Sequence, residues 1–109
     1  MITITMYQNK QGRYTGFSCI GHAGYASAGE DIVCAGVSAL VLNTINAVDA
    51  FTQDAFDANT DQKTGLIDIR FHHPVGHDVK LLLDTMALGL RDIQKNYGTD
   101  HCLIEFKEV

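Results

Sequence analysis

A histidine and a cysteine stand twelve positions apart in the segment GHAGYASAGEDIVCAGVSAL, which covers residues 21–40. His22 follows Gly21 in a glycine-bearing stretch, and Cys34 stands at the start of a long apolar run. A cysteine thiolate is a nucleophile, and a neighbouring imidazole is the base that activates it in thiol hydrolases. The imidazolium then protonates the leaving amine. These residue types therefore indicate acyl transfer to a thiol, provided that the chain folds His22 back onto Cys34.

The residues around Cys34 predict how its side chain is placed. Asp31 is a short acidic residue just ahead of the apolar run, which is typical of a helix N-cap. With Asp31 as N-cap, Cys34 would be the third helical residue, beside unpaired backbone N–H groups. The positive end of a helix favours a thiolate, and its N–H groups can bind an oxyanion. Ser38 follows one turn later on the same predicted helix face.

The same segment resembles the signature of the ribosomal-processing cysteine proteases, the Prp family. The shared pattern is a Gly-His-Ala start, a short glycine-containing loop, an Asp-Ile-Val-Cys-Ala run and a Ser-Ala pair. The matching residues are Gly21, His22, Ala23, Gly29, Asp31, Ile32, Val33, Cys34, Ala35, Ser38 and Ala39. Outside residues 21–40, the resemblance rests on chain length and on the order of the predicted elements.

This resemblance implies an activity and a site. Members of the family remove a short N-terminal extension from a precursor of a large-subunit ribosomal protein, act as small homodimers and need no cofactor. The resemblance assigns the catalytic dyad to His22 and Cys34, and the hinge of the loop to Gly21. It assigns supporting positions to Asp31 and Ser38. From the residues alone, Asp31 stays open between a helix cap and a third catalytic member, and Ser38 between helix packing and support of the site.

The pattern along the rest of the chain predicts an α+β domain that positions this segment. Alternating apolar and polar residues predict four strands, at residues 2–7, 13–20, 66–71 and 101–106. Helical spacing predicts two helices, over about 32–55 and 78–97. Residues 57–65 are polar and are predicted to form a loop. The order ββαβαβ predicts a two-layer sandwich in one domain over residues 1–109, with two helices packed on a mixed or antiparallel sheet.

The first predicted helix is apolar on nearly every side. Few polar residues interrupt it, namely Ser38, Asn43, Thr44, Asn46 and Asp49. A helix over 32–55 would be about 35 Å long, and a chain of 109 residues has little material to cover it all round. We therefore expect a partner subunit, and a homodimer is the simplest arrangement.

Composition and charge exclude several classes of protein. Apolar residues make up 46 % of the chain, which is too high for a disordered protein. The formal net charge of −5 argues against a nucleic-acid-binding protein, which needs a basic face. The chain contains no run of about 18 apolar residues, so a membrane span is not predicted. The first residues do not resemble a secretory signal. We therefore expect a cytoplasmic protein.

The cysteines and histidines leave two alternatives to a protease. The three cysteines form no CxxC pair, which favours reduced thiols, and Cys19 and Cys102 fit core positions in strands. His72, His73 and His77, with His101 and His22 elsewhere in the chain, could bind a metal. No cysteine or carboxylate joins them at helical or hairpin spacing, and we expect no metal. The other alternative is a non-catalytic assembly module that docks on a ribosomal protein, and such a module would tolerate Cys34→Ser.

Overall fold

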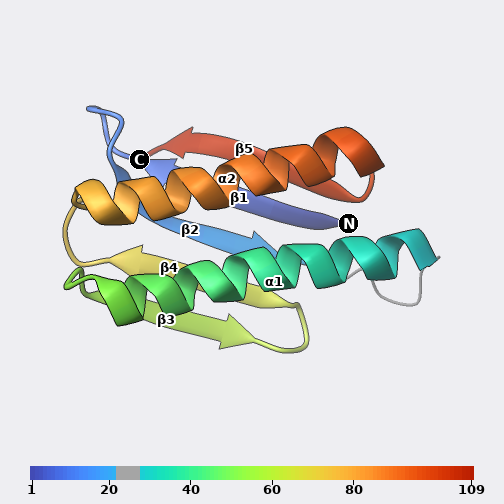
Figure 1. Cartoon of the computed structure of the whole chain (residues 1–109), viewed down its shortest axis with the longest axis horizontal. Helices are drawn as coiled ribbons and strands as arrows, with labels where there is room; N and C mark the ends of the chain where they lie inside the picture. The colour runs from blue at the N-terminus through green and yellow to red at the C-terminus, as the bar shows by residue number, and fades with distance from the viewer. Residues whose placement is uncertain (22–27) are drawn as a thin grey trace.

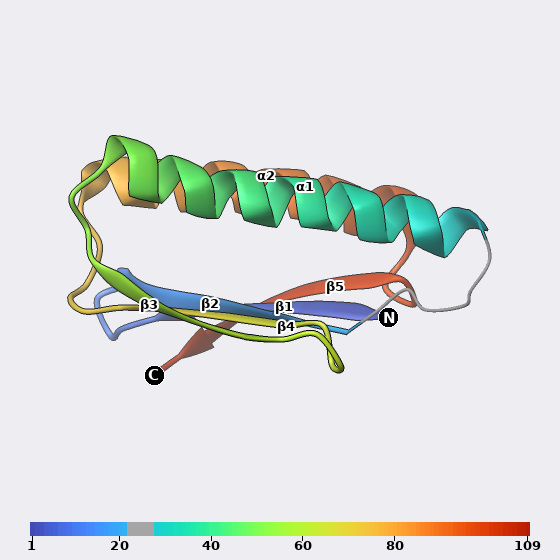
Figure 2. The ribbon, with the colours of Figure 1, turned by 90° about the horizontal axis from the view of Figure 1, so that it is seen from below.

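The computed structural model describes residues 1–21 and 28–109, and for residues 28–31 it describes only the backbone. The elements, in chain order, are β1 (Ile2–Gln8), β2 (Tyr14–Ile20), α1 (Ala28–Phe51), β3 (Phe56–Asp61), β4 (Leu66–Phe71), α2 (His77–Tyr97) and β5 (Cys102–Glu108). The two helices lie side by side on one face of the sheet (Figures 1 and 2). The predicted two-layer α+β fold is confirmed.

The sheet is mixed and has β2 at its centre. The strand order is β3-β4-β2-β1-β5. Strand β1 pairs antiparallel with β2 and parallel with β5, while β2–β4 and β3–β4 are antiparallel. A parallel neighbour requires a crossover connection, and α2 provides it between β4 and β5. Strands β3 and β5 are the two edges.

The prediction of a loop at 57–65 is wrong, because β3 occupies 56–61 and leaves only a short turn before β4. Five of the six residues of β3 are exposed, and only Phe56 is half-buried. Phe56 packs edge-on against Phe71 of β4, with ring centroids 5.8 Å apart. An edge strand without a buried face needs no alternating pattern, so its sequence resembles that of a loop.

The predicted start of the first helix is also wrong. Helix α1 begins at Ala28, three residues before Asp31, and ends at Phe51 rather than near residue 55. Asp31 therefore lies inside the helix and is not its N-cap. Ala28 and Glu30 are good helix formers, which allows the helix to continue upstream of the apolar run although Gly29 weakens the signal.

A glycine forms a tight contact within the sheet. The β1–β2 register shifts between Tyr7, which pairs with Gly16, and Gln8, which pairs with Tyr14. A Cβ on Gly16 would collide with the backbone carbonyl of Ile69 in the neighbouring strand β4. Only glycine therefore allows β2 and β4 to approach at this point.

The core lies between the sheet and the two helices. Four valines of α1 are buried there, namely Val33, Val37, Val41 and Val48. Helix α2 contributes Val79, Leu83, Met86, Ala87 and Leu90. The core also holds Cys19 and Cys102, which confirms both as core residues. Helix α1 also carries three exposed large apolar residues, namely Ile32, Leu42 and Phe51.

These exposed residues leave α1 unusually apolar for a surface helix. Among the described residues, Ile32–Phe51 is a helical stretch of 20 residues with a mean hydropathy of 1.6, which suffices by length and composition to cross a membrane. The core helix of a water-soluble protein passes the same test when it is mostly buried, but only 28 % of the window is buried in the single chain. The helix therefore has an apolar surface that the described residues of its own chain do not cover.

Candidate active site

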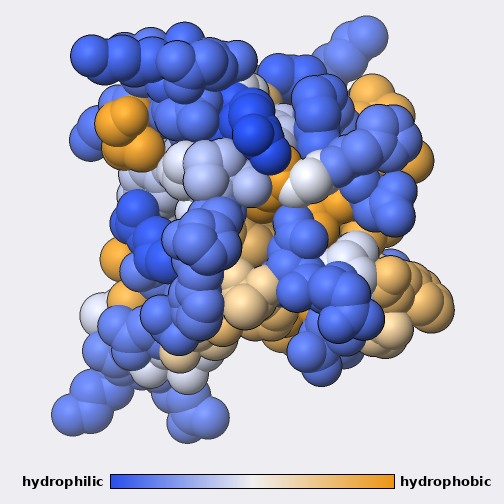
Figure 3. Space-filling model, turned by 90° about the vertical axis from the view of Figure 1, so that its left-hand side faces the viewer, coloured by the Kyte–Doolittle hydropathy of each residue, from blue (hydrophilic) through white to orange (hydrophobic). Residues whose placement is uncertain are grey.

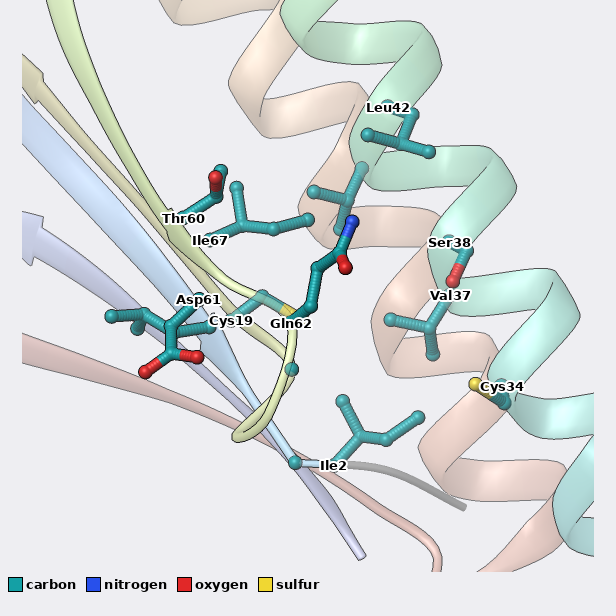
Figure 4. Close-up of a pocket in the computed structure, with 14 residues that line it drawn as sticks. Ile2, Cys19, Cys34, Val37, Ser38, Leu42, Thr60, Asp61, Gln62 and Ile67 are labelled. Carbon is teal, nitrogen blue, oxygen red and sulfur yellow. The ribbon is translucent and has the colours of Figure 1, made fainter. Parts of the chain in front are cut away.

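Cys34 lies on α1 at a cavity of about 460 Å³ between this helix and the sheet. Its side chain is half-buried, whereas the other two cysteines are buried. Ser38 and Leu42 line the same cavity, one and two turns further along α1. Figure 4 shows all three side chains along the part of the helix that borders the cavity. The predicted placement of Ser38 on the same helix face as Cys34 is confirmed.

The cavity has an apolar floor and a partly polar wall. The floor consists of Ile2 from β1, Cys19 from β2 and Ile67 from β4. Cys19 pairs with Ile67, and Ile67 pairs with Thr60 of β3, so the lining runs across neighbouring strands to the edge of the sheet. The wall is the β3–β4 hairpin tip, which contributes Thr60, Asp61, Gln62, Gly65 and Leu66. The shape suits an apolar side chain inside and polar backbone at the rim.

Gly21 holds the end of β2 at this cavity. Its φ angle is +114°, and a Cβ there would collide with the backbone carbonyl of Met1. Its N–H donates to the carbonyl of Thr64 in the β3–β4 turn at 3.1 Å. Gly21 also lines the cavity. The backbone at this residue is thus fixed between the first residue and the hairpin, in a conformation that favours glycine.

The new helix start changes the surroundings of Cys34. Cys34 is the seventh residue of α1, in its second turn, and not the third residue as predicted. The first four N–H groups of a helix lack a partner within it, and here they belong to residues 28–31. The N–H of Cys34 itself lies within the helical ladder. Its amide is therefore not an oxyanion donor, and the effect of the helix dipole has weakened at this position.

For two of the five predicted site residues, the structure does not describe the side chain. His22 lies outside the described residues, and so does the side chain of Asp31. Gly21, Cys34 and Ser38 are described, and all three line one cavity. The structure thus brings together at one cavity the three predicted site residues that it describes in full.

The other two thiols are poor nucleophiles. Burial, with smaller contributions from Cys102 and Cys34, raises the pKa of Cys19 to about 11. Burial also raises the pKa of the Cys102 thiol. Burial disfavours the charged form because a thiolate loses its hydration there. Cys34 is therefore the thiol of this chain with access to both solvent and a cavity.

Two histidines outside the motif, His72 and His77, each lie beside one carboxylate. His72 Nε2 lies 3.1 Å from Asp57 Oδ1, and His77 Nδ1 lies 3.2 Å from Asp78 Oδ1. Within residues 1–21 and 28–109, no group of three or more His, Cys, Asp or Glu side chains could hold a metal ion. Figure 3 views the end of the molecule away from the start of α1, where most of the surface is hydrophilic.

The hairpin wall is the part of the site that sequence reasoning missed. Residues 60–66 are exposed or half-buried and polar, and they look like any solvent-facing loop. The available signal was Phe56, an aromatic residue followed by a polar stretch and then by the clear strand at 66–71. That order is also compatible with a hairpin, but it does not distinguish a hairpin from a loop and a strand.

Comparison with known proteins gives consistent matches along the chain. The family model described as cysteine protease Prp matches residues 1–101. The ribosomal processing cysteine protease Prp of Staphylococcus aureus strain Mu50 is 35 % identical over 98 residues, which cover 90 % of this chain and 92 % of that protein. The protein of the same name from Bacillus subtilis strain 168 is 28 % identical over 101 residues, which cover 89 % and 90 % of the two chains.

Solved structures with sequence identities similar to those of these relatives have the same fold. A crystal structure of the S. aureus ribosomal processing protease Prp with a substrate peptide has a TM-score of 0.89 and 32 % identity, covering 98 % of this chain and all of that one. The structure of the same protease with a covalently linked product peptide has a TM-score of 0.87 and 33 % identity, with the same coverage. Both similar structures were thus determined with peptides.

Proposed function

Because the chain belongs to the cysteine protease Prp family, we propose that it removes the N-terminal extension from a precursor of a large-subunit ribosomal protein, using Cys34 as nucleophile and His22 as base. The observation that carries this proposal is the position of Cys34. Its half-buried thiol borders a cavity of about 460 Å³, while the other two thiols are buried. Relatives that carry this function in their name provide the substrate class.

The chemistry proceeds in two steps. His22 accepts the proton of Cys34, and the Sγ thiolate attacks the scissile carbonyl carbon to form a tetrahedral intermediate. The C–N bond breaks, the imidazolium protonates the leaving amine, and a thioester joins Cys34 to the extension. Water, deprotonated by His22, then attacks the thioester, which releases the extension as a carboxylate and restores the thiol. No cofactor takes part.

The proposed roles of the supporting residues rest on different observations. Ser38 lines the cavity one turn from Cys34, so its hydroxyl can form hydrogen bonds with groups at the attacked carbonyl. Gly21 fixes the point where the chain leaves β2 toward His22, which makes it an anchor of the loop. A supporting role for Asp31 now rests on the family resemblance, because Asp31 is not the helix cap that its sequence context indicated.

We also propose that the enzyme is a homodimer and that it works in the cytoplasm. Ile32, Leu42 and Phe51 expose apolar area along α1, and a second copy packed against this helix would cover part of it. Sedimentation at micromolar concentration is expected to give about twice the chain mass of 11.9 kDa, and a monomer alone would contradict the proposal. The three free thiols agree with a reducing compartment, where ribosomal precursors are made.

The deciding experiment incubates the precursor from the same organism with the wild-type enzyme, with Cys34→Ala and with Cys102→Ala. We expect mass spectrometry to find one cut near the N-terminus with the wild type and none with Cys34→Ala. Cys102→Ala is the matched control, since Cys102 is fully buried in β5 and does not line the cavity. Cutting by Cys34→Ala would contradict the proposed nucleophile, and an intact precursor with the wild type would contradict the proposed substrate.

A further inference from the structure

Strand β3 has a free edge. It is the outermost strand, and β4 is its neighbour on one side. The N–H of His72 donates to the carbonyl of Ala55 at 3.0 Å, which fixes the alternation of the β3–β4 ladder. Asp57, Asn59 and Asp61 therefore point their backbone groups toward β4. The N–H and C=O groups of Ala58 and Thr60 point away from the sheet, where no strand of the described chain lies.

This free edge adjoins the candidate site. Thr60 lines the cavity that Cys34 borders, and Ala58 precedes it by two residues on the same face of the strand. Helix α1 runs above this part of the sheet (Figure 2). An extended segment beside β3 would thus lie with one end near Cys34 and Ser38. The chain offers the backbone partners of a strand next to its nucleophile.

The sequence of β3 contains few of the devices that usually block an edge. Phe56–Asp61 contains no proline, lysine or arginine, and its pairing with β4 is regular. Its charges are the carboxylates of Asp57 and Asp61, and Asp57 is 82 % exposed. A second copy paired antiparallel on this edge would bring Asp57 and Asp61 of the two chains near each other, which is unfavourable. The charges favour a neutral or basic segment instead.

We infer that the peptide substrate binds as a sixth strand on the free edge of β3, paired with the backbone of Ala58 and Thr60, so that its scissile carbonyl reaches Cys34. This inference rests on the proposed function for the identity of the occupant. Strand addition gives affinity through main-chain hydrogen bonds, and side-chain pockets give the selectivity. The apolar cavity then selects a side chain near the cut, while β3 sets the register of the peptide.

The test is an N-methyl scan of a synthetic peptide that spans the cleavage junction of the precursor. Each peptide carries one N-methyl amide, and binding to the Cys34→Ala protein is measured by fluorescence anisotropy. Loss of one hydrogen bond is expected to weaken binding roughly five- to tenfold. We expect this loss at two amides that stand two residues apart, and less than about twofold at the amide between them. A loss without this alternation would overturn the inference.

Proline substitutions test the same edge from the side of the enzyme. Ala58→Pro removes an outward N–H that the β3–β4 ladder does not use, so it is expected to lower kcat/KM about five- to tenfold, mainly through KM. Glu108→Pro is the control. Alternation from the bond between Ile2 N–H and His101 C=O places the N–H of Glu108 outward on the opposite edge strand β5. We expect Glu108→Pro to leave kcat/KM unchanged, and equal values for Ala58→Pro and wild type would overturn the inference.

The outcomes separate this inference from the proposed function. Cleavage by the wild type with a flat methylation profile would refute the sixth strand and keep the protease. Alternating binding to Cys34→Ala without cleavage by the wild type would keep the sixth strand and refute the protease. Conversion of a dimer to a monomer by Ala58→Pro would assign the edge to a second copy and overturn the inference.

Discussion

Cys34 is expected to be alkylated at least two orders of magnitude faster than Cys19 and Cys102. Cys34 is half-buried at the cavity, whereas the Cys19 side chain is 6 % exposed and Cys102 is fully buried. Iodoacetamide reacts with the thiolate and must also reach the sulfur. Treatment of the folded protein at pH 8 should therefore modify Cys34 first.

The size of the difference follows from the ionisation of Cys19. Burial raises its pKa to about 11, so that about 0.1 % of this thiol is ionised at pH 8. A thiol at the ordinary pKa of 9.0 is about 9 % ionised at this pH. Ionisation alone therefore gives a ratio of about 90, and burial of the sulfur slows the reaction of Cys19 further. For Cys102, the raised pKa and the complete burial act in the same direction.

Intact-mass spectrometry over time, followed by peptide mapping, measures this prediction. We expect one adduct, on Cys34, while Cys19 and Cys102 stay unmodified. Cys34→Ser is the control and should take up no label when folded. Denaturation in urea should then expose two thiols in this variant and three in the wild type. Labelling of Cys19 in the folded protein at a rate close to that of Cys34 would refute the packing described for the cavity floor.

Two further predictions concern stability and the anchor of the loop. Tyr14→Phe removes the hydroxyl that donates to Asp84 Oδ1 at 2.6 Å, and should lower the free energy of unfolding at pH 7 by about 1 kcal/mol, or about 4 °C in Tm. Burial raises the pKa of Asp84, but hydrogen bonds from Lys80 and Tyr14 outweigh it and lower that pKa overall. The stabilisation is therefore full above about pH 4 and is lost as the pH falls through the lowered pKa. The curves of Tm against pH for the wild type and Tyr14→Phe should thus converge in acid, and parallel curves would contradict this. Gly21→Ala should lower both Tm and the cleavage rate, because its φ is +114° and a Cβ would meet the Met1 carbonyl. Gly12→Ala, with φ +78° and open space around the Cβ, is the control and should cost about 1 kcal/mol without loss of activity, whereas equal effects of the two substitutions would show that the Met1 contact is unimportant.

Sequence reasoning predicted the elements that bury a regular apolar face. Helix α2 and strand β4 were placed almost to the residue, because Val79, Leu83 and Leu90 repeat at helical spacing and Ile67 and Ile69 alternate. Strand β3 was missed because nearly all its side chains face solvent. Its existence depends on pairing with β4, which is a tertiary contact that local composition does not encode.

The candidate site was predictable in part for the same reason. The spacing of Cys34 and Ser38 by four residues places them on one helix face, whatever the exact helix start. The start itself depended on Asp31, whose type suits a cap but whose position is overridden by continuation of the helix to Ala28. The hairpin wall was not predictable, because the residues at 60–66 acquire a function only through their position beside α1.

The contact between Gly21 and Met1 has a practical consequence for producing the enzyme. The carbonyl of Met1 lies against Gly21, from which the chain continues to His22, and Gly21 borders the cavity. Any affinity tag fused ahead of Met1 would emerge beside this junction, whereas the C-terminus lies at the other end of the molecule (Figure 1). Purification through a C-terminal tag, or removal of an N-terminal one before kinetic assays, keeps added residues away from the reaction centre.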